Sequence, residues 1–218
     1  VQSNGGLIVA IISNAVTMAD AGAFSASLGS MVLIKTITLS SAAATIDFLN
    51  GASDVVFDGT YPTYKFVFTN MHPAATDPSF GFQVDVGTAT SYAQTITSTT
   101  FTAQAREDGD SGQASVAYQG GYDLAQGTGL QQLIGNILNS NDHGVSGELT
   151  IFSPSSGTFI KHFISKANTL ENANPPVMSS FHGAGYVNTA TALTRIRFKM
   201  GSGNIDAGTI KMYGIKDS

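Results

Sequence analysis

Apolar and polar side chains alternate with a period of two over most of the chain. Residues 63–69 (TYKFVFT) place Tyr64, Phe66 and Phe68 on one face of an extended segment. Residues 79–86 (SFGFQVDV) repeat the pattern with phenylalanine and valine. Because successive side chains of a β-strand point to opposite faces, this period predicts strands with one buried face.

Two pairs of such segments are separated by turn residues. Residues 147–152 (GELTIF) and 158–165 (TFIKHFIS) flank a Pro-Ser-Ser-Gly run. Residues 194–200 (TRIRFKM) and 209–215 (TIKMYGI) are separated by a run that begins Gly-Ser-Gly-Asn. These residue types favour tight turns. Each pair is therefore predicted to form a β-hairpin.

Two stretches carry weaker helical signals. Residues 14–28 are rich in alanine, which favours a weak helix, although Gly22 and the serines argue against a long one. Apolar residues between positions 130 and 138 recur at helical spacing, which indicates a short helix. They are Leu130, Leu133, Ile134, Ile137 and Leu138.

The organisation of the chain follows from these patterns. Residues 1–30 are rich in Ala, Gly, Ser and Asn and contain no lysine or arginine, so we interpret them as an arm that orders on a partner or on the domain. Residues 31–218 hold roughly eight to ten short strands with turn signals between them, as sandwiches do, and no alternation of strands with helices. The predicted fold is all-β: an antiparallel β-sandwich of jelly-roll type with an N-terminal arm.

The composition narrows the classes of function. Charged residues make up 11% of the chain, against about 25% in an ordinary soluble domain. Hydrophobic residues make up 42%, so the chain is not of the disordered type. Uncharged polar residues must therefore cover the surface, which suits faces that contact other subunits. A net charge of −5 without a basic block gives nucleic acid no binding site, and the absence of cysteine excludes disulfides.

The apolar run at residues 7–12 (LIVAII) raises the question of a membrane. It has six residues, whereas a transmembrane helix needs roughly 20. No basic residue precedes it, as a signal peptide would require. We therefore predict no membrane insertion, and interpret the run as a buried strand or an arm packed on a neighbour.

Candidate catalytic and metal-binding groups lack the spacing that their chemistry needs. No two histidines form a His-x-x-x-His pair, and the acidic loop at 107–110 lacks the distal glutamate of a calcium site. Asp85 and Glu148 are the one tempting carboxylate pair for glycoside hydrolysis, and nothing in the sequence brings them together. A Gly-x-Ser-x-Gly motif is absent. We predict a protein that is not an enzyme, with no catalytic, cofactor or metal site. The groups weighed were His72, His143, His162, His182, Glu107, Asp108 and Asp110.

Four of the ten basic residues fall in the last two predicted strands. Alternation puts Arg195, Arg197 and Lys199 on one face, and Lys211 joins them if the two strands pair as a hairpin. One interpretation is a solvated outer face whose charges prevent edge-to-edge pairing. The other is a contact with an acidic surface of a neighbouring subunit, which makes these four residues candidate subunit contacts.

Several stretches also carry a resemblance to a known group of proteins. They are residues 54–58 (DVVFD) leading to 64–66 (YKF), 70–74 (NMHPA), 154–156 (PSS) with 161–163 (KHF), and 202–215 (SGNIDAGTIKMYGI). Through them, residues 32–215 resemble small uncharacterised proteins of marine bacteriophages that are encoded among tail-fibre and appendage genes. The resemblance implies a structural protein of the virion, as a tail-fibre or surface-appendage subunit. It also implies a homo-oligomer, usually a trimer, that contacts other virion proteins and the host. Residues 1–30 lie outside the resemblance, and an added arm there would suit attachment to a larger particle.

Two other functions fit the same features. A capsid decoration protein would have the same fold and would use residues 1–30 to bind the head. A carbohydrate-binding module, with a host surface glycan as its ligand, needs exposed aromatic side chains in a cleft. The chain has no tryptophan, so tyrosines would have to serve. The candidates are Tyr61, Tyr92, Tyr118, Tyr122 and Tyr186.

Overall fold

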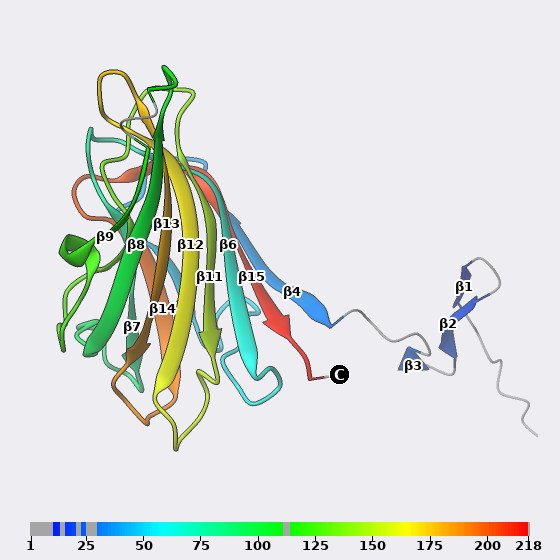
Figure 1. Ribbon diagram of the computed structural model, residues 1–218. Coiled ribbons are helices and arrows are strands. Elements are labelled where there is room, and N and C mark those ends of the chain that lie inside the picture. The colour runs from blue at the N-terminus through cyan, green and yellow to red at the C-terminus, as the bar shows by residue number, and fades with distance from the viewer. Residues whose placement is uncertain (1–10, 14–15, 21–22, 25–29, 111–113, 218) are drawn as a thin grey trace, which may run out of the picture.

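Two antiparallel β-sheets pack against each other in the computed structural model (Figure 1). The structure describes residues 11–13, 16–20, 23–24, 30–110 and 114–217. The larger sheet has eight strands in the order β4-β15-β6-β11-β12-β13-β8-β9, and the smaller has four in the order β10-β7-β14-β5. Strands β1, β2 and β3 form a separate three-stranded sheet.

The strands of the small N-terminal sheet are β1 (Ile11–Ser13), β2 (Val16–Asp20) and β3 (Ala23–Phe24). The sandwich consists of β4 (Met31–Thr38), β5 (Ile46–Leu49), β6 (Thr63–Pro73), β7 (Phe80–Val86), β8 (Ile96–Arg106), β9 (Ser115–Tyr118), β10 (Gln131–Ile134), β11 (Val145–Phe152), β12 (Lys161–Glu171), β13 (Val177–Val187), β14 (Leu193–Met200) and β15 (Ile205–Ile215), with one 3-10 turn, η2 (Gly120–Tyr122). Within these described residues, no helix has the length and apolar character needed to span a membrane.

The prediction of an all-β antiparallel sandwich is confirmed. A jelly roll usually has eight strands arranged as two Greek keys. Here one sheet alone has eight strands, and β11, β12 and β13 follow one another in it as a meander. The jelly-roll type is therefore not confirmed.

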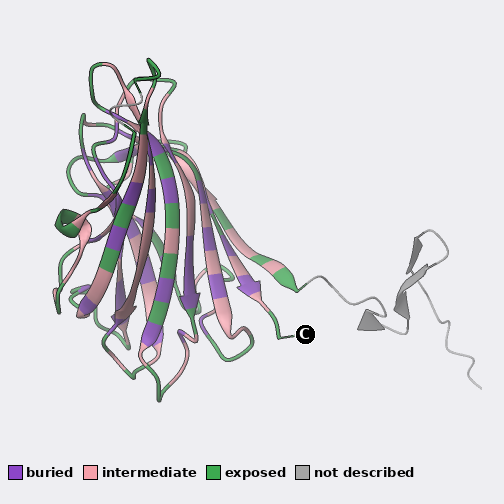
Figure 2. Cartoon of the chain, viewed as in Figure 1, coloured by how far each residue is buried: buried purple, intermediate pink, exposed green. Residues whose placement is uncertain are grey.

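Aromatic side chains fill the space between the two sheets. The inward residues of β6 are Tyr64, Phe66 and Phe68, as the alternation predicts, and all are at most 1% exposed. Figure 2 shows buried positions alternating with less buried ones along the strands. From the smaller sheet, Phe48 and Phe198 reach the ring of Phe66, with centroids 5.3 and 5.4 Å away. Burial of each of these rings contributes roughly 2–3 kcal/mol to the stability of the fold. Packing of the aromatic side chains is therefore the main interaction that holds the two sheets together.

One predicted hairpin is confirmed and the other is wrong. Strands β11 and β12 pair in register, with Glu148 opposite Lys166. Strand β14 instead pairs with β5 and β7 in the small sheet, while β15 pairs with β4 and β6 in the large one. The connection after Met200 therefore crosses between sheets. A period of two indicates only that a strand has one buried face. The buried faces of β14 and β15 pack on the same core from opposite sides, so the period does not show which sheet each strand joins.

Both predicted helices are replaced by strands where the structure describes them. The segment 130–138 contains β10, and Leu133, Ile134 and Ile137 are all buried in the core. Periodicity alone cannot distinguish a short apolar run in a buried strand from a short buried helix, so the spacing of apolar residues was ambiguous there. Residues 16–20 and 23–24 form β2 and β3, and the rest of the 14–28 stretch lies outside the described residues.

Lys161 is a buried cation that holds two loops together. It occupies an inward position of β12 and its side chain is fully buried. The ammonium donates hydrogen bonds to the carbonyl oxygens of Ser156, Phe159, Thr189 and Ala190, at 2.7, 2.6, 3.3 and 3.1 Å. Burial lowers the pKa of Lys161, and the carbonyl oxygens replace the water it has lost. The side chain thereby joins the β11–β12 turn to the β13–β14 loop.

Replacement of Lys161 by methionine should destabilise the fold by roughly 2–4 kcal/mol, because buried carbonyl oxygens lose their donor. Urea unfolding followed by circular dichroism measures the change. The matched control is Lys166→Met on the exposed face of the same strand, for which we expect a change within about 0.5 kcal/mol. Equal costs for the two variants would contradict the role assigned to Lys161.

Candidate functional site

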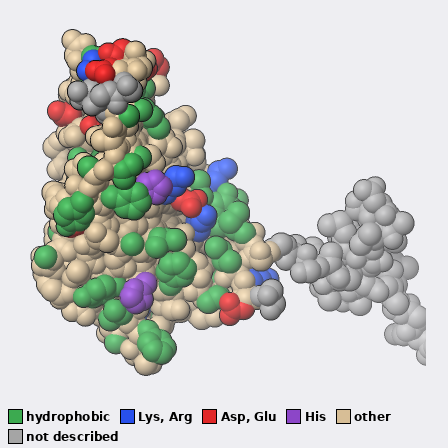
Figure 3. All heavy atoms as spheres, viewed as in Figure 1, with side chains coloured by type: hydrophobic (Ala, Val, Ile, Leu, Met, Phe, Trp, Pro, Cys, Tyr) green, Lys and Arg blue, Asp and Glu red, His purple; other side chains and the backbone are tan. Residues whose placement is uncertain are grey.

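The outer face of the eight-stranded sheet carries a groove that runs along the middle of β13. Its floor is Ala184, which the strand register places between Thr99 of β8 and Ile164 of β12. Figure 3 shows hydrophobic side chains spread over this face, with charged side chains gathered near its middle. We call this feature the β13 groove. Its walls are Thr97, Thr99 and Phe101 on one side and His162, Ile164 and Lys166 on the other, and His182 and Tyr186 close its ends.

Two glycines flank the groove floor because the core beneath them leaves no room for a side chain. A Cβ added to Gly185 would lie 2.7 Å from the Phe163 ring and 2.5 Å from the Thr97 carbonyl oxygen. A Cβ on Gly183 would lie 2.8 Å from the Ser165 hydroxyl. The outward residue between them is only an alanine, so the middle of β13 has no large side chain on either face. The larger side chains of the neighbouring strands project further from the sheet on both sides of it.

The upper end of the groove is an aromatic stack beside a cation. Phe101 lies on His182 with ring centroids 4.9 Å apart and an interplanar angle of 5°. Lys166 follows His182 in the same cross-strand row. The space beside them has a volume of about 360 Å³. This end therefore offers flat apolar rings within reach of one ammonium group.

The lower end is wider and more apolar. His162 and Tyr186 form a cross-strand pair with ring centroids 6.0 Å apart, and Phe152 stands next to them on β11. The volume there is about 430 Å³. Both ends share Thr99, Ile164 and Ala184 as lining, so they are parts of one continuous depression. From His182 to Tyr186 it runs about 13 Å along the strand.

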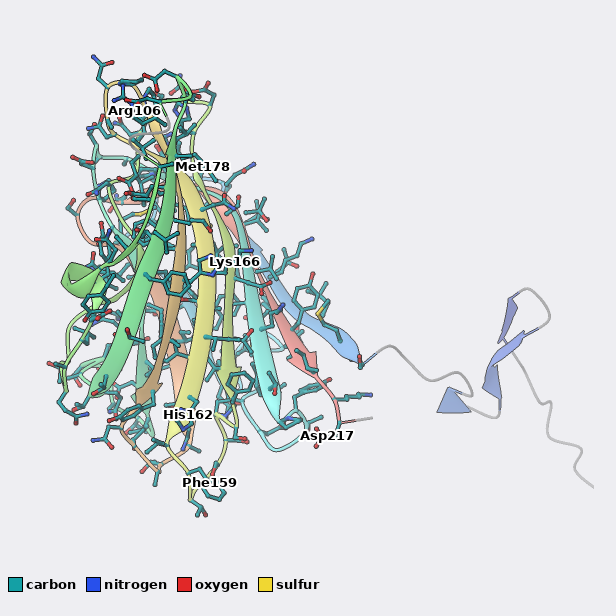
Figure 4. The ribbon with its side chains drawn as sticks, viewed as in Figure 1. Arg106, Phe159, His162, Lys166, Met178 and Asp217 are labelled. Atoms are coloured by element: carbon teal, nitrogen blue, oxygen red, sulfur yellow. The ribbon has the colours of Figure 1, made fainter. Side chains whose placement is uncertain are left out.

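The charges near the groove are unbalanced. Glu148 is bound to Lys65, with the ammonium 2.8 Å from the carboxylate oxygen. Lys166 makes no ion pair with any residue that the structure describes, although Glu148 lies opposite it in the register. Lys211 projects from the same face, two strands beyond Glu148. Figure 4 places Lys166 and His162 on the same strand, in the middle of the face and near its lower end.

The basic residues predicted as one contact group lie on two different faces. Arg195, Arg197 and Lys199 alternate with buried residues on β14, so their shared outward face is as predicted. Lys211 lies on β15, in the other sheet, and its predicted place beside them is wrong because the hairpin does not form. Whether any of the four contacts another subunit stays a prediction.

Two of these basic side chains already have acidic partners within the chain. Arg197 lies 3.5 Å from an Asp47 oxygen and stacks over the Tyr92 ring at 3.5 Å from its centroid. Arg195 lies opposite Asp85 in the register. These partners neutralise part of the positive charge that would attract an acidic surface of another subunit. This favours a role for Arg195 and Arg197 in stabilising the fold of their own chain.

Asp85 is buried and organises the loop that follows β7. Its carboxylate accepts hydrogen bonds from the backbone N–H groups of Val86 and Tyr92 and from the Gln94 amide, at 3.0, 2.7 and 2.9 Å. Burial acts to raise the pKa of Asp85, but these donors and the nearby Arg195 outweigh it and hold the pKa below its usual value. Glu148 belongs to the other sheet and faces outward, so the two carboxylates form no catalytic pair.

Three more of the groups weighed from the sequence, His72, Asp108 and Asp110, have partners within the chain. His72 contacts Asp206 through Nδ1 at 2.6 Å and the Ser140 carbonyl oxygen through Nε2 at 3.1 Å. In the acidic loop, Arg106 lies 2.7 Å from Asp108 and 3.6 Å from Asp110. Over the described part of the chain, no three His, Asp or Glu residues are grouped so that they could hold a metal ion.

Of the five tyrosines considered for sugar binding, only Tyr186 lines the groove. Tyr92 is buried, Tyr61 lies against Gly214, and Tyr122 packs edge-on to Phe181. Tyr118 lies exposed on β9. The other aromatic side chains of the groove are Phe101, Phe152, His162 and His182. Nothing in the sequence groups them, because only the strand register brings them together.

A second exposed feature is the free edge of β4. This strand bonds to β15 on one side, and no strand that the structure describes pairs with its other side. Met31 and Leu33 on it are 52% and 51% exposed. Lys35 is its one charged residue. At the opposite edge of the same sheet, β9 exposes Val116 and Tyr118.

No protein-family model, curated protein or solved structure matches this chain. The resemblance to bacteriophage virion proteins therefore stays a prediction.

Replacement of Asp85 by asparagine should cost roughly 2 kcal/mol at neutral pH, because hydrogen bonds to a carboxylate become bonds to a neutral amide. The folded pKa of Asp85 lies below its unfolded value of about 3.9, so this stabilisation is present above that pH and is lost as the pH falls through the folded pKa. The difference between the two proteins should therefore shrink on acidification. Unfolding free energies at neutral and acid pH test this, with the exposed Asp54→Asn as control, and a difference that stays constant with pH would contradict it.

Proposed function

We propose that this protein is a non-enzymatic structural subunit of an extracellular assembly, that it joins copies of itself, and that the assembly is a bacteriophage virion. The observation that carries the self-association is the unpaired edge of β4. The virion, and within it a tail fibre or surface appendage, is proposed on the resemblance of residues 32–215 to phage proteins.

The β4 edge has the properties of an interface strand. An edge strand presents unpaired N–H and C=O groups that bond readily to another strand. Soluble proteins usually protect such edges with several charges, a proline or a bulge that turns the strand away. Strand β4 has one bulge, at Ile34 in its pairing with β15, but it has no proline and a single lysine. It also exposes two apolar side chains, Met31 and Leu33. A second copy of the chain supplies both missing hydrogen bonds and an apolar cover.

The arm suits the same arrangement. Residues 1–30 precede Met31 directly in the chain, so the arm ends where the proposed interface strand begins. An arm at that place can reach a neighbouring subunit or another virion protein. A contact through the arm would attach the sandwich to a larger particle, which is what an appendage subunit or a capsid decoration protein requires.

The number of subunits in the assembly depends on which strand of a second copy pairs with β4. Pairing of β4 with its own copy about a twofold axis gives a dimer. Pairing of β4 with β9 of the next copy is heterologous. It gives a ring, such as the trimer that the resemblance implies, when the rotation between copies closes, and a filament when it does not. The apolar side chains at both edges, Leu33 on β4 and Val116 on β9, fit the second arrangement.

The charge content of the chain is the supporting observation for assembly over an enzymatic role. Only 11% of its residues are charged, and burying such a surface against a sister subunit needs little desolvation of ions. A capsid decoration protein remains the second candidate. An image of the particle separates the two: copies along a fibre support an appendage, and copies over the head support decoration.

Replacement of Leu33 by glutamate should convert the assembly into monomers, because the carboxylate would be buried against an apolar neighbour. Sedimentation velocity of the purified chain should give an oligomer, and the variant should dissociate at least roughly tenfold more readily. The control is Met178→Glu, a comparable exposed apolar residue on β13, which should leave the mass unchanged. A wild-type chain that is monomeric at all concentrations would overturn the proposal.

A further inference from the structure

We infer that the β13 groove binds an acidic carbohydrate, with sugar rings on its aromatic side chains and a carboxylate group at Lys166. The inference goes beyond the proposed assembly role and does not rest on it, because the groove and the β4 edge are separate parts of the sheet. It names a ligand class, and it would give a virion appendage a means of touching a cell surface.

The shape of the groove suits a flat, elongated ligand. It runs about 13 Å between two aromatic groups on one strand, and its floor is a single methyl group. Its two parts, of about 360 and 430 Å³, are each large enough for a small ligand. The floor and both walls belong to the paired strands β8, β12 and β13, so the depression is formed by the sheet itself rather than by loops.

The side chains of the walls match the two faces of a sugar ring. A pyranose has an apolar C–H face, which packs on aromatic rings such as Phe101 at one end and Tyr186 at the other. It also has hydroxyl groups around its rim, which need donors and acceptors. The hydroxyls of Thr97 and Thr99 and the imidazole of His162 lie along the walls and can supply them.

The charge of the face selects an anionic ligand. Glu148 also lines the upper end of the groove, but its carboxylate is paired with Lys65. The Lys166 ammonium lines the same end without an ion pair among the described residues. Lys211 adds a second positive charge to the same face. A carboxylate placed near Phe101 and His182 would complete the bonding of Lys166 and gain from the surrounding positive potential.

The same charges disfavour a second copy of the chain as the occupant. A face-to-face dimer about a twofold axis near the groove would bring Lys166 towards its own counterpart, and like charges at an interface cost free energy. An acidic peptide could satisfy Lys166, but it would leave the aromatic rings at both ends without flat partners. The carbohydrate satisfies both parts of the groove at once.

The test is a printed array in which each oligosaccharide bearing a uronic or sialic acid stands beside its carboxyl-reduced analogue. The native chain should bind acidic members and lose roughly tenfold or more in affinity for the reduced partners. Raising the ionic strength from about 0.01 to about 0.15 M should weaken binding, because it screens Lys166. Binding to no acidic member, or equal binding to both members of each pair, would overturn the inference.

Three variants locate the site. Lys166→Gln should lower the affinity of the best array member roughly tenfold by calorimetry, while Lys211→Gln, on the same face but outside the groove, should change it by less than about twofold. Ala184→Phe fills the floor and should abolish binding, with circular dichroism to confirm that the sheet persists. If Ala184→Phe fails to fold, the two lysine variants decide the question, and equal effects of both would contradict the assignment.

Competition separates the other occupants. A polyglutamate peptide that displaces the sugar at equal concentration would show that the groove binds acidic peptides and would overturn the carbohydrate assignment. The Leu33→Glu variant should bind the sugar with unchanged affinity per subunit. Loss of assembly with retained binding therefore leaves this inference standing, and retained assembly without binding leaves the proposed function standing.

Discussion

The ring of Phe163 lies between Phe82 of the smaller sheet and the backbone of Gly185 in its own sheet. Its centroid is 5.2 Å from that of Phe82, in an edge-on arrangement, and the ring fills the space that a side chain at residue 185 would need. The same contact therefore joins the two sheets and keeps β13 free of inward side chains at its centre. Phe163 packs directly beneath the strand whose outer face carries the groove, so a change of core volume at Phe163 would alter both the stability of the fold and the shape of the groove.

Much of the fold could be predicted from the sequence because one buried face is a local property. Alternation identified the inward Tyr64, Phe66 and Phe68, and turn residues identified the β11–β12 hairpin. The sequence could not decide which sheet each strand joins, because Phe198 and Met212 present the same period to one core from opposite sides. This is why Lys211 was wrongly grouped with Arg195 and Arg197. The buried Lys161 did leave a signal: alternation puts it on the face of Phe163, where a cation needs a special reason.

The candidate site was out of reach for a different reason. Its side chains come from positions 101, 152, 162, 166, 182 and 186, on four strands, and only the register brings them together. The histidines lack the sequence spacing of metal ligands, so a search for metal-binding motifs does not select them. His162 and His182 instead line the groove with flat aromatic rings. The Gly-Ala-Gly run at 183–185 was the one local signal, since small residues in the middle of a strand indicate close approach of a neighbour.

The low content of charged residues is relevant to both surfaces, the β4 edge and the β13 groove. Few charged side chains repel other proteins from its surface. The molecule offers one sheet edge that a further strand can join and one face on which the Lys166 ammonium, without an ion pair among the described residues, lies beside aromatic rings. The most direct measurement of the central claim, that β4 is an interface, is amide hydrogen exchange of the native protein across a range of concentrations. The account predicts that the β4 amides not bonded to β15 become protected as the concentration rises, while those of β13 do not change. Fast exchange of these β4 amides at every concentration would contradict it.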